Sequence, residues 1–126
     1  MRLRLHSDVY AVCRLPGDAA PPVPPAARAG FWSLTLAGSE RSLVCPEADA
    51  PASGTVSGGW RLLEVEGPLD LGLTGVMATL SAALAGAEVP IFTIATHDTD
   101  WILVPGAQLD AAVAALRTAG HGVDGR

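Results

Sequence analysis

The chain has 126 residues, which suffices for one compact domain or for two small units that share a core. Eight basic residues against thirteen acidic ones give a net charge near −5, and this balance argues against a nucleic-acid partner, because phosphate contacts depend on basic side chains. Apolar residues make up 49% of the chain but aromatic ones only 5%, so we expect a core of Leu, Val, Ile and Ala.

No apolar run reaches the roughly 18 residues that a membrane span requires. The first eight residues, MRLRLHSD, contain charged and polar residues too early for the apolar segment of a signal peptide. We therefore expect a cytoplasmic protein without membrane contact. Cys13 and Cys45 lie in apolar stretches without CxxC spacing. This placement favours buried, reduced thiols over a disulfide or a nucleophile.

The chain begins with patterns typical of strands. Alternation of apolar and basic residues over 2–6 predicts a short strand, and residues 10–15 predict a second one after a turn at Ser7–Asp8. The proline-rich residues 16–25 cannot form a helix interior, because proline lacks an N–H donor, so they predict an extended surface loop.

The next segments predict a hairpin and a second loop. Residues 31–36 and 42–45 are strand-like and flank a turn at Gly38. Residues 46–59 are small and polar, which predicts a hinge-like loop. The first half is therefore expected to be mostly β.

The second half begins with a strand over residues 60–66 and continues with a helix over 74–87, a segment rich in Ala, Leu and Met. Val76, Leu80 and Leu84 recur at four-residue steps, which predicts an apolar helix face that packs on a sheet.

The remaining segments predict a hairpin, a second helix and a last strand. Residues 90–95 and 101–104 form the hairpin, and residues 107–119 form a helix that ends at Gly120, a residue suited to a left-handed cap. Residues 121–123 are expected to add a short strand.

This order of elements is the βαββαβ order of a ferredoxin-like α+β sandwich, in which the helices cover one face of an antiparallel sheet. An offset of 60 residues aligns Leu3 with Leu63 and Phe31 with Ile91, which indicates a weak internal repeat. We therefore expect a degenerate, mostly β half at residues 1–56 and a complete domain at residues 57–126.

Specific segments carry a family resemblance beyond this periodicity. They are residues 40–45 (ERSLVC), 66–70 (EGPLD), 73–77 (LTGVM), 91–96 (IFTIAT) and 99–105 (TDWILVP). The run resembles the ACT domains of the CASTOR-like group, which includes cytosolic arginine sensors and small bacterial proteins and is similar to the regulatory domains of aspartate kinases.

The resemblance implies an ACT domain at residues 57–126 and an ACT-like copy at residues 1–56. It further implies a non-catalytic regulatory sensor that binds a free amino acid, needs no cofactor and passes its signal to a protein target. The chain departs from its relatives at Ala95, where Ser is frequent, and at Pro90, where a ligand-contacting Ser can occur.

A site for an amino acid needs an anion for the ammonium and backbone N–H donors for the carboxylate. The first N–H groups of the helix after Gly75 are such donors, and glycine permits close approach. The resemblance to the arginine sensors assigns the acid to Asp100. The candidate ligand-binding residues are Asp70, Leu71, Thr74, Gly75, Val76, Val89, Ile91, Thr96 and Asp100.

Each of the main candidates also has a structural interpretation. Asp100 can cap N–H groups of its own turn, Thr74 can cap the helix, and Gly75 can serve close packing between helix and strand. ACT sites usually form where two units pair, so the resemblance implies that backbone groups of residues 89–91 of one unit face Gly75 and Asp100 of another. The second unit is either the first half of the same chain or a second copy, and we favour a homodimer because the first half lacks a counterpart of the Leu-Thr-Gly segment.

The alternatives to an amino-acid sensor are a metal site, an enzyme and a pure interaction module. His97, Asp98 and Asp100 cluster in one turn, but donors so close in sequence rarely converge on a metal ion. No G-x-S-x-G motif supports a catalytic triad. A module that dimerises or binds a protein without any small ligand is the main alternative, and the identity of the amino acid stays open.

Overall fold

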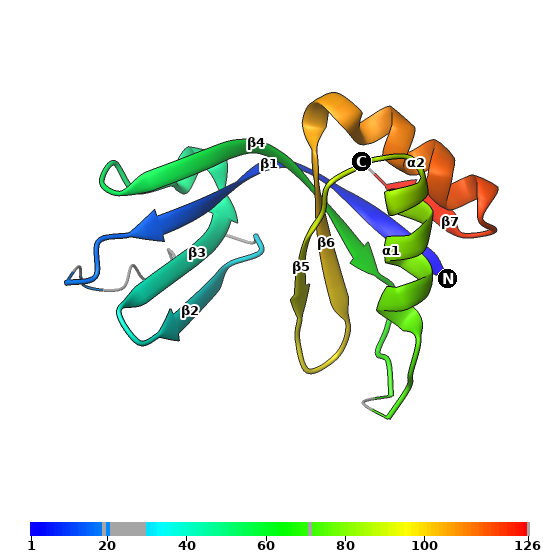
Figure 1. The fold of residues 1–126 in the computed structure, drawn as a ribbon, viewed down its shortest axis with the longest axis horizontal. Helices are drawn as coiled ribbons and strands as arrows, with labels where there is room; N and C mark the ends of the chain where they lie inside the picture. Colours follow the sequence, from blue (N-terminus) through cyan, green and yellow to red (C-terminus); the bar gives the residue numbers. More distant parts are fainter. Residues whose placement is uncertain (19, 21–29, 71, 126) are drawn as a thin grey trace. The chain divides into compact units, whose positions relative to one another are not determined.

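The computed structural model describes residues 1–18, 20, 30–70 and 72–125. It contains two compact units: residues 1–7 with 61–126, called here the helical unit, and residues 8–60, called here the β unit. Two strands, β1 (Arg2–Leu15) and β4 (Thr55–Val65), contribute residues to both units (Figure 1). The division into an ACT-like half at 1–56 and an ACT domain at 57–126 stays a prediction, and the compact units group residues 1–7 with the second half.

The helical unit confirms the predicted βαββαβ order. After β4 come α1 (Val76–Gly86), β5 (Phe92–Ala95), β6 (Asp100–Pro105), the 3₁₀ turn Gly106–Gln108, α2 (Leu109–Thr118) and β7 (Gly122–Gly125). The strands of this unit lie in the order β5, β6, β4, β1 and β7. The first strand of the chain thus lies between β4 and β7, and it pairs with β7 in parallel, with Leu3 opposite Val123.

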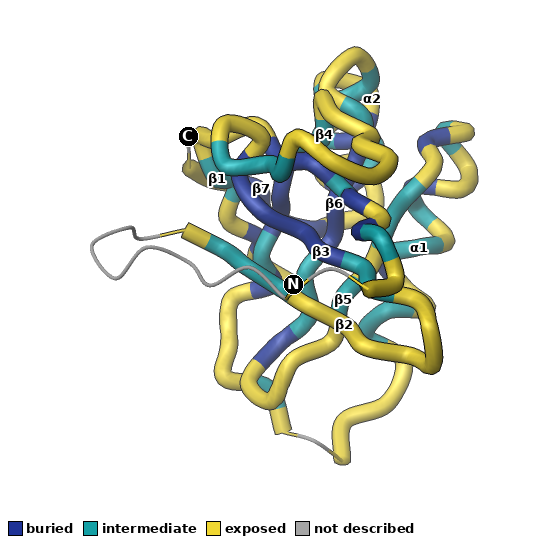
Figure 2. The backbone as a smooth tube through the Cα atoms, turned by 90° about the vertical axis from the view of Figure 1, so that its left-hand side faces the viewer, coloured by how far each residue is buried: buried dark blue, intermediate teal, exposed yellow. Residues whose placement is uncertain are grey.

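Both helices pack on strands of this sheet through one core cluster (Figure 1). The apolar face predicted for the first helix is confirmed, since Leu80 and Leu84 are fully buried. Figure 2 shows buried positions along the strands and exposed backbone in the connecting loops. The buried members of the cluster are Leu3, Leu63, Val65, Leu80, Leu84, Val89, Ile102, Val104, Ala112, Leu116 and Val123.

The structure corrects two predicted breaks. The turn expected at Ser7–Asp8 is wrong, because β1 runs without interruption from Arg2 to Leu15. The loop expected over residues 46–59 is too long, because β4 already begins at Thr55. In both cases strand pairing extends through residues whose own β propensity is low.

The β unit contains the predicted hairpin, formed by β2 (Ser33–Ala37) and β3 (Glu40–Pro46) and followed by the 3₁₀ turn Glu47–Asp49. Its small core consists of Ala11, Cys13, Leu15, Leu43 and Cys45. Both cysteines are buried free thiols. Most of the predicted proline-rich loop, residues 19 and 21–25, lies outside the described residues.

Candidate functional site

The helical unit holds a cavity of about 360 Å³ between the start of α1, the loop before it and the tip of the β5–β6 hairpin. Its volume lies within the range of small-molecule sites in proteins, about 300–1,000 Å³. The lining residues are Leu69, Asp70, Leu73, Gly75, Val76, Met77, Ala78, Ala95, Thr96, His97, Asp98, Thr99 and Asp100.

The first turn of α1 provides backbone donors to this cavity. Gly75 is the N-cap residue, and its carbonyl accepts the first helical bond from Thr79. The N–H groups of Val76, Met77 and Ala78 precede that bond, and no side chain caps the helix. All three residues line the cavity, and no acidic residue lies in this first turn. The turn therefore offers unpaired donors and a partial positive charge to an anionic group.

Gly75 adopts a left-handed conformation, with φ at 81° and ψ at −1°. A Cβ atom at this position would meet nothing within 4 Å. Glycine is therefore needed here for the backbone angle rather than for close packing between helix and strand. The capping role predicted for Thr74 is wrong, since Gly75 holds the N-cap position without any side-chain hydrogen bond.

Asp100 begins β6 on the other side of the cavity and is half-buried. Its backbone pairs with Ala95 across the hairpin. Within the described part of the chain, no residue donates a hydrogen bond to its carboxylate. The turn-capping role considered for Asp100 is therefore absent among these residues. The carboxylate is available to a cationic group in the cavity.

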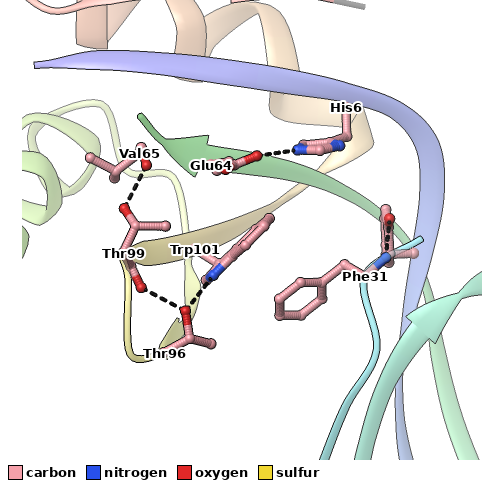
Figure 3. Close-up of polar contacts among 8 residues, drawn as sticks. His6, Phe31, Glu64, Val65, Thr96, Thr99 and Trp101 are labelled. Atoms are coloured by element: carbon pink, nitrogen blue, oxygen red, sulfur yellow. Dashed lines mark hydrogen bonds and ion pairs between the residues drawn. The ribbon is translucent and has the colours of Figure 1, made fainter. Parts of the chain in front are cut away.

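The hairpin tip has its own hydrogen-bond network (Figure 3). The Thr96 hydroxyl donates to the Thr99 carbonyl at 3.0 Å and accepts the indole N–H of Trp101 at 2.9 Å. Because its only proton is used, the hydroxyl can contribute a remaining lone pair to a ligand but no donor. Thr96 therefore suits an ammonium group better than a carboxylate.

Two further bonds join this tip to the loop before α1. Thr99 is 6% exposed, and its hydroxyl donates to the carbonyl of Val65 at the end of β4 (Figure 3). The N–H of Leu69 donates to the Asp98 carbonyl at 2.6 Å. At Gly67 a Cβ atom would lie 3.0 Å from that same carbonyl, so the loop and the tip lie very close together. These contacts position the two walls of the cavity.

Asp70 and the His97–Asp98 pair have local roles as well. The Asp70 carboxylate accepts the N–H of Gly72 at 2.9 Å, which closes a turn. His97 and Asp98 pair with each other at 2.8 Å, and both side chains are largely exposed. No cluster of three metal-ligating side chains occurs in residues 1–18, 20, 30–70 and 72–125.

The cavity brings together five of the predicted site residues: Asp70, Gly75, Val76, Thr96 and Asp100. Thr74 is exposed beside it but does not line it, and Leu71 lies outside the described residues. Val89 is 4% exposed inside the core, and Ile91 packs against that core, so neither lines the cavity of its own chain.

Sequence reasoning missed several lining residues, among them Leu69, Met77 and Thr99. The helical period could have indicated Met77 and Ala78, which complete the first turn after Gly75. Thr99 carried no comparable signal, because its role depends on Val65, which is distant in sequence.

In the described part of the chain, none of the helices has the length and apolar character required to cross a membrane. A search of curated proteins returns no match. The family model that matches the chain is that of the ACT domain, over residues 55–118.

Solved structures share the fold. Protein Atu0741 from Agrobacterium tumefaciens is 28% identical at a TM-score of 0.87, over 99% of this chain and 92% of that chain. VC0802 from Vibrio cholerae, a protein of unknown function described as a possible transport protein, is 18% identical at a TM-score of 0.67, over 94% and 88%. The ligand-free regulatory subunit of aspartate kinase from Thermus thermophilus is 14% identical at a TM-score of 0.63, over 94% and 96%.

The last two similarities concern the fold alone, while the family match covers β4, both hairpin strands and both helices. The βαββαβ order of the helical unit agrees with that match. The chain therefore belongs to the ACT domain family, whose members are regulatory and non-catalytic domains.

Proposed function

We propose that this protein is a regulatory sensor that binds a free amino acid in the cavity between α1 and the β5–β6 hairpin. One observation supports this proposal above the others: the unpaired N–H groups after Gly75 and the unpaired carboxylate of Asp100 line the same cavity. Donors for an anion and an acceptor for a cation are the two features that a zwitterion requires.

In the proposed complex, the α-carboxylate of the ligand accepts hydrogen bonds from the N–H groups of Val76, Met77 and Ala78. The ammonium, or a cationic side chain, lies against Asp100 with the Thr96 hydroxyl as a further acceptor. The side chain of the ligand contacts the apolar part of the lining, which includes Leu69, Leu73 and Met77.

The charge of the lining favours neutral or basic amino acids over acidic ones. Asp70, Asp98 and Asp100 carry carboxylates, and none of the lining residues is Lys or Arg. A second carboxylate on the ligand would therefore meet acceptors without a compensating cation. An acidic lining suits arginine, the ligand of the sensors in the CASTOR-like group, and it suits neutral amino acids as well.

We further propose that the protein is a cytoplasmic homodimer that reports ligand binding to a protein target. The strand β5 is the last in the sheet order of the helical unit, so one of its edges lacks a strand partner among the described residues. Residues 89–91 precede this strand, and their backbone groups are the proposed contribution of a second copy to the site. Pairing at this edge would protect the exposed strand.

A thermal-shift panel with the twenty amino acids tests the function. A ligand at one hundred times its dissociation constant stabilises the native state by about 2.7 kcal/mol, which raises the melting temperature by several degrees. Asp100→Asn should remove the part of the shift that comes from binding in this cavity, because the variant retains the shape of the side chain but loses its charge. Asp18→Asn, an exposed substitution in the β unit, is the matched control and should retain the shift.

The competing function is an interaction module without a small ligand. Leu36 on strand β2 is 57% exposed and Leu34 is 37% exposed, although both are large and apolar. These side chains suit a protein contact. A flat amino-acid panel, together with a dimer that dissociates on substitution Leu36→Ser, would favour this alternative.

A further inference from the structure

A second concave surface lies in the helical unit and shares no residue with the cavity at α1. This groove has a volume of about 400 Å³ and is lined by Arg4, Leu5, His6, Ser7, Glu66, Asp124 and Gly125. It is built from β1, from Glu66 directly after β4, and from β7. The cavity at α1, in contrast, is lined by residues between 69 and 100.

The shape of the groove depends on a glycine. Gly125 has a φ of 108°, and a Cβ atom there would lie 2.6 Å from the carbonyl oxygen of Leu5. Only glycine therefore lets the end of β7 approach β1 this closely.

The charged residues of the groove lie on the sheet face opposite the helices. Leu3 and Val65 point into the helical core, and strand alternation directs Arg4 and Glu66 to the other face. The two strands are held together here, because the N–H of Glu66 donates to the Arg2 carbonyl at 2.9 Å.

The groove contains two charges that have no ion-pair partner within the described part of the chain, the guanidinium of Arg4 and the carboxylate of Glu66. Asp124, in contrast, pairs with Arg2. A free cation and a free anion in one groove match a ligand that carries both charges itself.

His6 adds a positioned polar group. Its Nε2 lies 2.9 Å from the Glu64 carboxylate (Figure 3), and its ring lies against Trp101 with a centroid separation of 5.9 Å. Because a carboxylate only accepts, Nε2 carries the proton and Nδ1 is left without a described partner. Arg4 and His6 are two residues apart on β1, so their side chains lie on the same face of the sheet.

We propose that this groove is a second small-molecule site, independent of the cavity at α1, and that it binds short zwitterions such as free amino acids and dipeptides. Arg4 binds the carboxylate and Glu66 binds the ammonium, while His6 contacts polar atoms between them. The site is open to solvent, so we expect binding in the micromolar to millimolar range.

A titration of the ¹⁵N-labelled chain with alanine, arginine and alanyl-alanine, followed by NMR, tests this proposal. The backbone amides of residues 4–7 and 122–125 should shift in a saturable manner with at least one of these ligands. N-acetylalanine lacks the ammonium and alanine amide lacks the carboxylate, so each should bind about tenfold more weakly than the parent zwitterion.

Variants identify the charges responsible. Arg4→Gln and Glu66→Gln should each weaken binding by about tenfold, and the exchange of both charges, Arg4→Glu with Glu66→Arg, should restore part of it. Arg14→Gln, an exposed substitution in the β unit, is the control and should leave the affinity unchanged. The melting temperature of each variant separates loss of binding from loss of fold.

The experiment tests binding at the two sites separately. Asp100→Asn should remove shifts at residues 76–78 and leave those of the groove, and Arg4→Gln should do the reverse. The proposal for the groove is overturned if no zwitterion shifts its amides at millimolar concentration, if N-acetylalanine binds as well as alanine, or if neither charge substitution changes the affinity.

Discussion

At the scale of single residues, Gly75 decides how the chain enters α1. Its left-handed φ of 81° directs three free N–H groups of the first turn toward the cavity. A Cβ atom at Gly75 would meet nothing within 4 Å, so glycine is required here for its backbone conformation and not for close packing. A substitution here should therefore act through the backbone alone.

Gly75→Ala should lower the free energy of unfolding by about 1 kcal/mol, because alanine adopts a positive φ only with strain. The matched control is Gly86→Ala at the last residue of α1, where a Cβ atom also meets nothing but no positive φ is required. That variant should be neutral or stabilising. Urea denaturation of both proteins measures the difference, and equal effects would contradict the role assigned to Gly75.

The two buried cysteines make a second residue-scale prediction. Burial raises the pKa of Cys45 to about 12, with a smaller contribution from Cys13, and burial also raises the pKa of Cys13 from its ordinary value of 9.0. In the unfolded chain both thiols ionise near 9, while the folded chain keeps Cys45 protonated. The stability contributed by the protonated thiol is therefore complete below about pH 9 and is lost between pH 9 and about 12.

Unfolding free energies measured by urea denaturation between pH 8 and pH 11 check this expectation. Cys45→Ala should make the decline shallower. A decline will remain, because burial also raises the pKa of Tyr10 above its ordinary value of 10.0. An unchanged slope in the variant would show that the thiol does not contribute.

At the scale of elements, the site depends on a contact between the β5–β6 hairpin and the loop that follows β4. The Thr99 hydroxyl bonds to Val65, and the Leu69 N–H bonds to Asp98, so two segments about thirty residues apart in sequence hold each other. Each segment contributes one wall of the cavity. The hairpin turn alone would position Asp100 but not the helix start.

Thr99→Val, which keeps the shape but removes the hydroxyl, should lower the free energy of unfolding by about 1–3 kcal/mol, because the buried Val65 carbonyl loses its donor. Thr99→Ser retains the hydroxyl and should cost less. Hydrogen exchange of the Leu69 amide is the specific readout: it should accelerate in Thr99→Val and change little in Thr99→Ser. Equal protection in both variants would contradict the contact described here.

At the scale of the whole molecule, two strands belong to both compact units. Residues 1–7 of β1 complete the sheet of the helical unit, where Leu3 is fully buried and pairs with Val123. The matched residues 55–118 therefore contain the ACT motif but not the strand that separates β4 from β7.

A fragment of residues 57–126 should melt at a lower temperature than the whole chain, or fail to fold cooperatively. It loses the partner of β7 and the burial of Leu3. Burial of a Leu side chain contributes about 1.5–3 kcal/mol, in a domain whose free energy of unfolding is about 5–15 kcal/mol. Residues 1–7 joined by a flexible Gly-Ser linker to residues 61–126 should restore cooperative melting by circular dichroism. A fully stable fragment 57–126 would show that β1 is dispensable.

The sequence by itself determined the local elements of this protein. The four-residue apolar period predicted α1, the glycine after residue 119 predicted the end of α2, and Gly120 indeed has a φ of 95°. Neighbouring residues govern these features through helix propensity and turn geometry. Gly75 could be named for the same reason, since it lies at the start of a local element, while Asp100 was assigned by the resemblance to the arginine sensors.

The tertiary structure alone decided what depends on residues far apart in the chain. Strand pairing made β1 continuous through Ser7 and Asp8 and placed it between β4 and β7. The same long-range packing buried Val89 in the core, made Thr99 a link to Val65 and brought Arg4 and Glu66 into one groove. A strand accepts partners from any distance in sequence, and its register is set by the face that becomes buried, so no local pattern contains this information.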